Sequence, residues 1–290
     1  MDRGRRQRAH APPGMETRVA KGHHAAMLRL LLCVVLAVAV LAPAPAAEPG
    51  MALIPGGTFT MGSARGLADE RPPHTVTLKS YWIDRHAVTN AEFAAFLEKL
   101  GGFRNARGQH LFDWDDGDAR LRRVQGKWRA DPGFERHPAN EMSWYGARDY
   151  CEAVGKRLPT EAEREYAARG KDGRTYPWGE AEPDKTRARF GAGWIETVPV
   201  GSYPAGATPE GVFDLAGNIN EWTSTIMRSY PYRADDGRET PDILADRVVR
   251  GGAADTGADT LRGSWRGASV SRSARAGHHN IGFRCVKGAG

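Results

Sequence analysis

The chain has 290 residues, with 41 Lys and Arg against 35 Asp and Glu, and 40% of its residues are hydrophobic. These proportions are typical of a foldable globular chain and exclude a wholly disordered protein, a collagen-like repeat and a multi-span membrane protein. The formal charge of +6 is concentrated at the front, because residues 1–47 hold seven basic and two acidic side chains and leave the remainder at +1. The charge therefore gives no support to a nucleic-acid partner.

A leader is predicted over residues 1–47. From Met27 the chain has one early basic residue, Arg29, then a short apolar run and small residues up to Ala47. This layout is typical of a cleaved secretory signal peptide. An uncleaved anchor is the alternative, and only then would the protein contact a membrane, although the run is shorter than the ~20 apolar residues of a span. We expect an exported protein, periplasmic or secreted, with one domain over 48–290.

Three amphipathic helices are predicted in the exported part. Their predicted spans are 89–100, 143–154 and 160–169. The first and third begin with capping boxes, formed by Thr89 with Glu92 and by Thr160 with Glu163. The first ends where glycines follow Leu100.

The rest of the exported part has only short strand signals. Strands are expected at 75–78, 81–83, 198–200, 248–250 and 282–286. The stretches 101–141 and 223–247 are polar and irregular, and we expect them to lie outside the core. The pattern predicts an α+β fold with a high loop content, which usually needs cross-links or bound ions to hold its loops.

Two cysteines, Cys151 and Cys285, remain once the leader is removed. In an oxidising compartment a disulfide is the economical hypothesis. A redox-active or metal-binding thiol pair is the alternative, and the spacing is not that of a CxxC motif. Cys151 lies on the inner side of the second predicted helix, so a bridge would join that helix to the C-terminal segment.

Acidic and aromatic clusters offer further candidate sites. The run Asp113–Asp118 is similar to half of a calcium loop, but its glycine comes one place early and Val124 stands where an EF-hand needs Glu, so we expect a solvated acidic loop. Several tryptophans could line a ligand groove or form the core. They include Trp144, Trp178, Trp222 and Trp265.

Six sequence blocks, read in order, resemble the formylglycine-generating enzyme family, also called sulfatase-modifying factor domains. The blocks are IPGGTFTMGS from Ile54, DERPPH from Asp69, VTNAEF from Val88, GKRLPTEAE from Gly155, GVFDLAGN from Gly211, and RGG at Arg250 with NIGFRC from Asn280. They span residues 51–287. The resemblance implies a loop-rich variant of the C-type-lectin-like fold and a disulfide between Cys151 and Cys285.

The resemblance also implies a copper(I) site, which these residues do not reproduce. Family members oxidise a substrate cysteine with O2 and a copper ion held by two cysteines after the Arg-Gly-Gly block. Here those positions carry Thr256 and Leu261, which lack the soft thiolates that copper(I) requires. We therefore expect no copper and no formylglycine formation at this place, and we assign no catalytic residue.

A calcium site is implied by a second matched feature. Family members bind calcium through a side chain at the Asp214 position, carbonyls at the Gly217 and Ile219 positions, and a carboxylate at Glu221. Clustered hard oxygen ligands suit Ca²⁺. The alternative is an acidic turn in which Asp214 caps neighbouring amides and Glu221 pairs with an arginine. Arg164 and Asn220 stand where the family commonly has tryptophan, a change that we expect to affect surface or cleft packing.

The histidine pair His278–His279, with Asp255 and Asp259 earlier in the same segment, could form a non-heme iron triad. Relatives that make a sulfur-modified histidine betaine or mature a siderophore chromophore do oxidative chemistry on this domain type. Adjacent histidines in a strand would point to opposite faces, however. Iron therefore stays open.

The resemblance and the missing thiols lead to a first functional hypothesis and two rivals. The first is an exported accessory or maturation protein that binds a peptide or partner protein in the family cleft. The second is an oxidoreductase of the same fold with a different metal or cofactor. The third is a lectin-like binding module without turnover.

Overall fold

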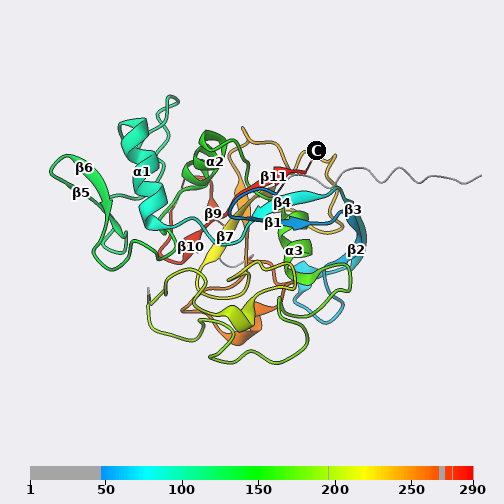
Figure 1. Ribbon diagram of the computed structural model, residues 1–290. Helices are drawn as coiled ribbons and strands as arrows, with labels where there is room; N and C mark the ends of the chain where they lie inside the picture. The colour runs from blue at the N-terminus through cyan, green and yellow to red at the C-terminus, as the bar shows by residue number, and fades with distance from the viewer. Residues whose placement is uncertain (1–46, 195, 268–271, 276, 290) are drawn as a thin grey trace, which may run out of the picture. The chain divides into compact units, whose positions relative to one another are not determined.

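The computed structural model describes residues 47–194, 196–267, 272–275 and 277–289. The predicted leader, apart from its last residue, lies outside these ranges. Within them the chain forms three α-helices, α1 (Asn90–Leu100), α2 (Trp144–Ala153) and α3 (Glu161–Arg169), shown in Figure 1. All three predicted helices are confirmed, because their starts depend on local caps: Thr89 and Thr160 form the predicted capping boxes, and Ser143 caps α2.

Short strands form small sheets, as an α+β fold with many loops requires. The strands are β1 (Met51–Ile54), β2 (Gly57–Met61), β3 (His74–Leu78), β4 (Tyr81–Asp84), β5 (Leu121–Val124), β6 (Lys127–Ala130), β7 (Asn220–Ile226), β8 (Asp246–Arg250), β9 (Arg272–Ser273), β10 (Ile281–Gly282) and β11 (Val286–Gly288). One sheet has the order β1-β4-β11 and another the order β10-β7-β8-β9, while β2–β3 and β5–β6 are separate antiparallel pairs. The β11 strand thus brings the C-terminal segment beside the first strands (Figure 1).

The disulfide between Cys151 and Cys285 is present, with an S–S distance of 2.00 Å. It joins α2 to the residue before β11 and closes a loop of 134 residues, for which the chain-entropy estimate is on the order of 5 kcal/mol. Both cysteines lie in the largest hydrophobic core cluster, together with Phe93, Trp222 and Phe283. The bridge therefore stabilises the centre of the domain.

The tryptophans named above mostly serve the core. Trp144, Trp222 and Trp265 are buried, and Trp178 is half-buried against Tyr176. The core interpretation holds for three of the four.

Three expectations from the sequence are wrong. The stretch 101–141 contributes to the core, because the β5–β6 pair turns Leu121 and Trp128 inward while its alternate residues face solvent. The stretch 223–247 is also partly buried, since β7 continues to Ile226. In addition, the buried guanidinium of Arg247 donates hydrogen bonds to backbone carbonyls. Residues 198–200 form no strand, because their amides bond to a side chain and a loop carbonyl.

Two further sequence expectations concern the last predicted strand and the membrane. The predicted strand 282–286 is divided between β10 and β11. No helix in the described ranges has the length and apolar character needed to cross a bilayer.

Candidate functional site

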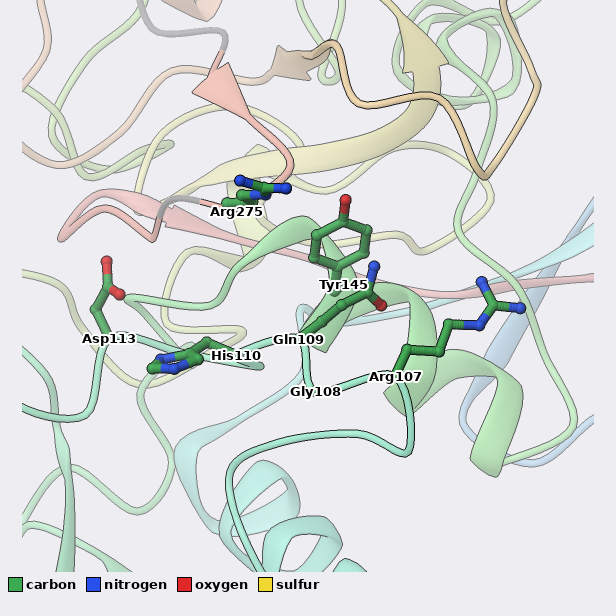
Figure 2. A pocket seen from close by; sticks show the side chains of 7 residues that line it. All are labelled: Arg107, Gly108, Gln109, His110, Asp113, Tyr145 and Arg275. Atoms are coloured by element: carbon green, nitrogen blue, oxygen red, sulfur yellow. The ribbon is translucent and has the colours of Figure 1, made fainter.

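A cavity of about 300 Å³ opens between the loop after α1, the first turn of α2 and the C-terminal segment. We call it the loop cavity, and its lining residues are Arg107, Gly108, Gln109, His110, Asp113, Tyr145 and Arg275. Figure 2 shows Arg275 on one side, the loop residues on the other and the Tyr145 ring between them. A second cavity of about 280 Å³ shares Arg107 with it and is also lined by Arg148 and Asp242. The two cavities are thus neighbours that share one lining residue.

The start of α2 fixes the wall of the loop cavity. Ser143 Oγ donates to the His110 carbonyl at 2.7 Å, and the Ser143 amide donates to the Leu111 carbonyl at 3.1 Å. Gly146 sits so close to this loop that a Cβ there would lie 1.9 Å from the Leu111 carbonyl oxygen. Only glycine permits this approach, so the position of the loop relative to Tyr145 is fixed.

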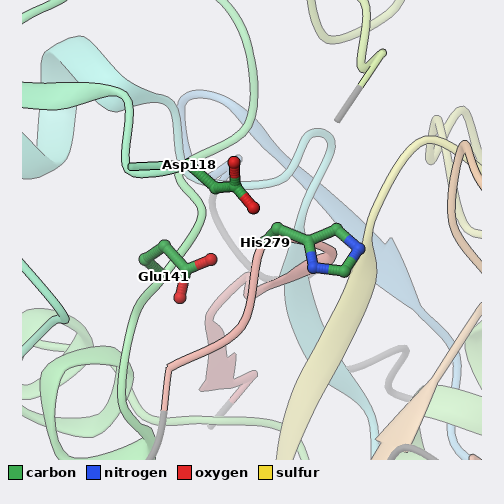
Figure 3. Close-up of side chains that lie close together, drawn as sticks. All are labelled: Asp118, Glu141 and His279. Carbon is green, nitrogen blue, oxygen red and sulfur yellow. The ribbon is translucent and has the colours of Figure 1, made fainter. Parts of the chain in front are cut away.

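A second group of side chains lies next to this cavity. Asp118, Glu141 and His279 each offer one ligand atom, and these atoms lie within 4.8 Å of one another. Figure 3 shows the three side chains turned toward a common point. We call them the carboxylate–histidine cluster. Asp113 links it to the loop cavity, because its amide donates to the Glu141 carbonyl at 3.0 Å and its carboxylate accepts from Gly277 N at 3.1 Å.

The side chain of Asn140 binds the backbone of two cluster residues. Its side-chain amide donates to the carbonyls of Asp118 at 2.9 Å and His279 at 3.3 Å. Glu141 adopts a φ of 58°, in the left-handed region that costs a non-glycine residue free energy. Gly277 packs on its carbonyl, where a Cβ would lie at 2.3 Å. The surrounding contacts thus impose the orientation of Glu141.

The His279 ring has fixed partners on its other sides. Its Nε2 lies 2.8 Å from Asp255 Oδ2, and Asn280 Nδ2 donates to Asp255 Oδ1 at 3.2 Å. Burial alone would raise the pKa of Asp255, but hydrogen bonds from His279 and Asn280 lower it below its ordinary value. The Trp194 ring contacts the His279 ring with 3.6 Å between the centroids and a tilt of 30°, and Trp194 Nε1 donates to Asp118 Oδ2 at 2.7 Å.

The structure places the predicted histidine pair in a different setting from the expected strand. His278 and His279 lie in a loop, not in a strand, and their rings are 4.2 Å apart. His279 meets Asp255 as the sequence suggested, and no contact with Asp259 is observed among the described residues. Its further neighbours are Asp118 and Glu141. Asp118 belongs to the predicted acidic loop, whose Asp115 and Asp116 are exposed as expected.

The positions of the family copper cysteines are occupied by hydrogen-bonded and buried residues. Thr256 Oγ1 contacts the hydroxyl of Thr260 at 2.8 Å, and Leu261 is buried in a small apolar cluster. Within the described ranges the cysteines are Cys151 and Cys285, both in the disulfide. These residues do not fit copper(I), because neither position supplies a soft ligand.

The predicted calcium residues show the contacts of the alternative interpretation. Asp214 Oδ2 accepts from Gly201 N at 2.7 Å, and burial raises the pKa of Asp214. Glu221 accepts from Arg164 Nε at 2.6 Å and from Arg284 Nη2 at 2.7 Å. Burial alone would raise the pKa of Glu221, but the two guanidiniums lower it.

This donor set fits calcium poorly as it stands, because two guanidiniums already neutralise Glu221. Arg164 and Asn220 are fully buried, so their departure from the family pattern changes the interior and not the surface. The Gly217 carbonyl accepts from Ile219 N at 2.9 Å. Calcium at this place stays a prediction, and a bound ion would have to compete with Arg164.

Sequence reasoning missed Glu141, Trp194 and the lining of the loop cavity. The motif that carries His279 was found, but Glu141 lies 138 positions away from it in the chain and has no motif of its own. The local signal is an Asn-Glu pair at 140–141, separated by one residue from the helix cap Ser143.

Comparisons with known proteins agree with this architecture. A family model described as a sulfatase-modifying factor enzyme 1-like domain matches residues 37–289. The serine/threonine-protein kinase Pkn1 of Chlamydia trachomatis is 38% identical over 243 residues, which cover 82% of this chain and 38% of that protein. This chain thus spans well under half of that relative.

Other relatives match over more of their length. The formylglycine-generating enzyme of Mycobacterium tuberculosis is 34% identical over 292 residues, covering 80% of this chain and 96% of that enzyme. The hercynine oxygenase of Mycolicibacterium smegmatis is 32% identical, with shares of 77% and 59%. The solved structure of PvdO from Pseudomonas aeruginosa superposes with a TM-score of 0.66 and 26% identity, covering 84% of this chain and 100% of that one.

Proposed function

The chain belongs to the sulfatase-modifying factor family, and from this premise we propose that it is an exported accessory or maturation protein that binds a segment of a partner polypeptide. One observation carries the proposal: the loop cavity and its neighbour meet at Arg107. Two neighbouring cavities suit an extended peptide, which could enter both, better than a compact small molecule. The partner is a peptide or protein, not a nucleic acid.

The lining residues favour an acidic segment. Arg107 and Arg275 both line the loop cavity, and the Tyr145 ring offers a flat apolar surface between the two arginines. The Arg107 guanidinium also pairs with Asp242 at 2.8 Å. Arginine binds carboxylates through paired N–H groups, and tyrosine supplies contact area at a small entropy cost. An extended peptide with an Asp or Glu next to an apolar side chain would match this arrangement.

Two features support export and a role other than formylglycine formation. The disulfide between Cys151 and Cys285 is typical of proteins from oxidising compartments, and residues 1–47 have the layout of a signal peptide. Thr256 and Leu261 supply no thiolate for copper. The family cleft would then be retained for recognition.

The test is peptide binding by fluorescence anisotropy with an arrayed library of short peptides. We expect acidic peptides to bind, and Arg275→Ala to weaken them about tenfold or more, since a hydrogen bond to a charged group contributes about 1.5–3 kcal/mol. Arg65→Ala, an exposed arginine outside both cavities, is the matched control. Equal affinities in the wild type, Arg275→Ala and Arg65→Ala would contradict the proposal.

A second candidate is an oxidoreductase that uses a metal without cysteine ligands. The observation in its favour is the carboxylate–histidine cluster beside the loop cavity. Two carboxylates and an imidazole are a ligand type that redox-active first-row metals accept. Its distinguishing test is a change in the mass of a bound peptide under air, which the accessory role does not produce.

A further inference from the structure

We propose that Asp118, Glu141 and His279 bind a divalent transition-metal ion. The proposal deepens the oxidoreductase candidate, which rests on such a metal, but metal binding itself needs no substrate. The three ligand atoms lie within 4.8 Å of one another (Figure 3). Small movements of the side chains would bring each within bonding distance of one ion.

The donor set selects the class of ion. One imidazole nitrogen and two carboxylates suit Zn²⁺, Fe²⁺, Mn²⁺ or Co²⁺, whereas copper(I) prefers thiolates, and calcium prefers six to eight oxygen ligands. Glu141 and His279 are buried and Asp118 is half-exposed. Two of the three ligands would therefore bind an ion from the interior, and Asp118 would bind it from the more exposed side.

The histidine is oriented as a metal ligand requires. Metal-binding histidines usually give their second ring nitrogen to a carboxylate, which fixes the tautomer and the ring plane. Asp255 Oδ2 lies 2.8 Å from His279 Nε2, so Nδ1 is the ring nitrogen for the metal. Asn280 in turn holds Asp255 at 3.2 Å.

Backbone contacts fix the positions of the three ligand residues. Asn140 bridges the backbones of Asp118 and His279, and Gly277 holds Glu141 in its left-handed conformation. Such strain is found where the surroundings over-determine a functional geometry.

The ring of Trp194 covers the site on one side. The ring contacts the His279 ring at a tilt of 30°, and its Nε1 donates to Asp118 Oδ2 at 2.7 Å, although 61% of the Trp194 surface is exposed. Trp194 therefore links two of the three ligand residues. Its fluorescence would report an ion bound between them.

The test uses Co²⁺ as the probe and the exported chain treated with a chelator and then dialysed. Visible absorption and Trp fluorescence follow the titration, and Zn²⁺ is added afterwards as a competitor. We expect one Co²⁺ per chain, visible ligand-field bands and displacement by Zn²⁺. We expect Asp255→Asn to bind about 10–100-fold more weakly, the usual cost of losing a carboxylate that orients a ligand.

Two ligand variants and two matched controls make the test decisive. His279→Ala and Asp118→Asn should lose at least as much affinity as Asp255→Asn, and Asp118 is half-exposed, so its variant should keep the fold. Two control variants, Asp115→Asn and His86→Gln, should bind Co²⁺ as the wild type does. Asp115 is exposed in the same loop as Asp118, and His86 stacks on Phe213, which is not part of the cluster. The proposal would be overturned if the wild type bound no Co²⁺ or if all variants bound it equally. Either result would leave the proposal of peptide binding in the loop cavity unchanged.

Discussion

Removal of the buried guanidinium of Arg164 should destabilise the domain strongly. Arg164 Nε donates to Glu221 Oε2 at 2.6 Å, and Nη2 donates to the Leu215 carbonyl at 2.9 Å. The side chains of the ion pair are at most 2% exposed. In Arg164→Met, the carboxylate of Glu221 would stay buried with one cation fewer.

The magnitude follows from the cost of breaking a buried ion pair, about 3–5 kcal/mol. Arg284 remains bound to Glu221 at 2.7 Å, so we expect the lower end, about 3 kcal/mol. For a domain of this size each kcal/mol corresponds to about 2–4 °C in Tm, so the Tm should fall by about 6–12 °C.

Urea unfolding under non-reducing conditions, followed by Trp fluorescence, measures this loss. Arg107→Met is the matched control, because Arg107 forms an ion pair with Asp242 in which both side chains are more than half exposed. Such a pair contributes about 0–1 kcal/mol. A loss below about 1 kcal/mol in Arg164→Met would refute the assignment of Arg164 as an essential partner of Glu221.

The same variant tests the calcium prediction. Without the Arg164 guanidinium, Glu221 is freer to bind an ion together with Asp214 and the carbonyls of Gly217 and Ile219. We expect calcium to raise the Tm of Arg164→Met more than that of the wild type, since a ligand at 100 times its Kd stabilises by about 2.7 kcal/mol. If calcium changes neither Tm, the calcium prediction is wrong.

The remaining predictions concern the cross-link, the pH dependence and the cavity wall. Replacing both bridged cysteines by serine should cost about 2–5 kcal/mol, and iodoacetamide should leave Cys151 and Cys285 of the unreduced, denatured wild type unlabelled; mass labelling checks this. Burial alone would raise the pKa of Glu70, but Arg262 lowers it below 4.5, so its contribution is present above about pH 4.5 and lost as the pH falls through the folded-state pKa. Urea titrations should therefore show a stability gap between wild type and Glu70→Gln that shrinks on acidification; a gap that grows would contradict the ion pair. Gly146→Ala should lose about 1–3 kcal/mol and weaken peptide binding, because its Cβ would meet the Leu111 carbonyl, whereas Gly102→Ala has open space and should leave peptide binding unchanged.

Local signals in the sequence predict the helices well and the remaining elements less well. Helix starts depend on residues three apart, such as Thr89 with Glu92, which a sequence displays directly. The β5–β6 pair was hidden because its buried residues, Leu121 and Trp128, stand among many charged ones. The apolar residues near 198–200 suggested a strand, but loop contacts satisfy their amides.

The candidate site was only partly predictable for a similar reason. The segment with His279 and Asp255 drew attention because of its histidines. Glu141 and Asp118 come from distant parts of the chain, and the side-chain amide of the neighbouring Asn140 joins the carbonyls of Asp118 and His279, a contact that no motif records. Likewise, the burial of Arg164 depends on Glu221, 57 positions away. Such pairings appear only once the fold is known.

The most direct test of the accessory role is the mass of a bound peptide. A cysteine-containing acidic peptide that binds the loop cavity is incubated with the purified protein, copper(I) and O2 and then measured by mass spectrometry. Once disulfides formed by copper and O2 alone have been reduced, we predict a peptide of unchanged mass, since Thr256 and Leu261 supply no thiolate for copper. Loss of the thiol sulfur and gain of an aldehyde oxygen would contradict the accessory role and show that the chain is an oxidase of its family.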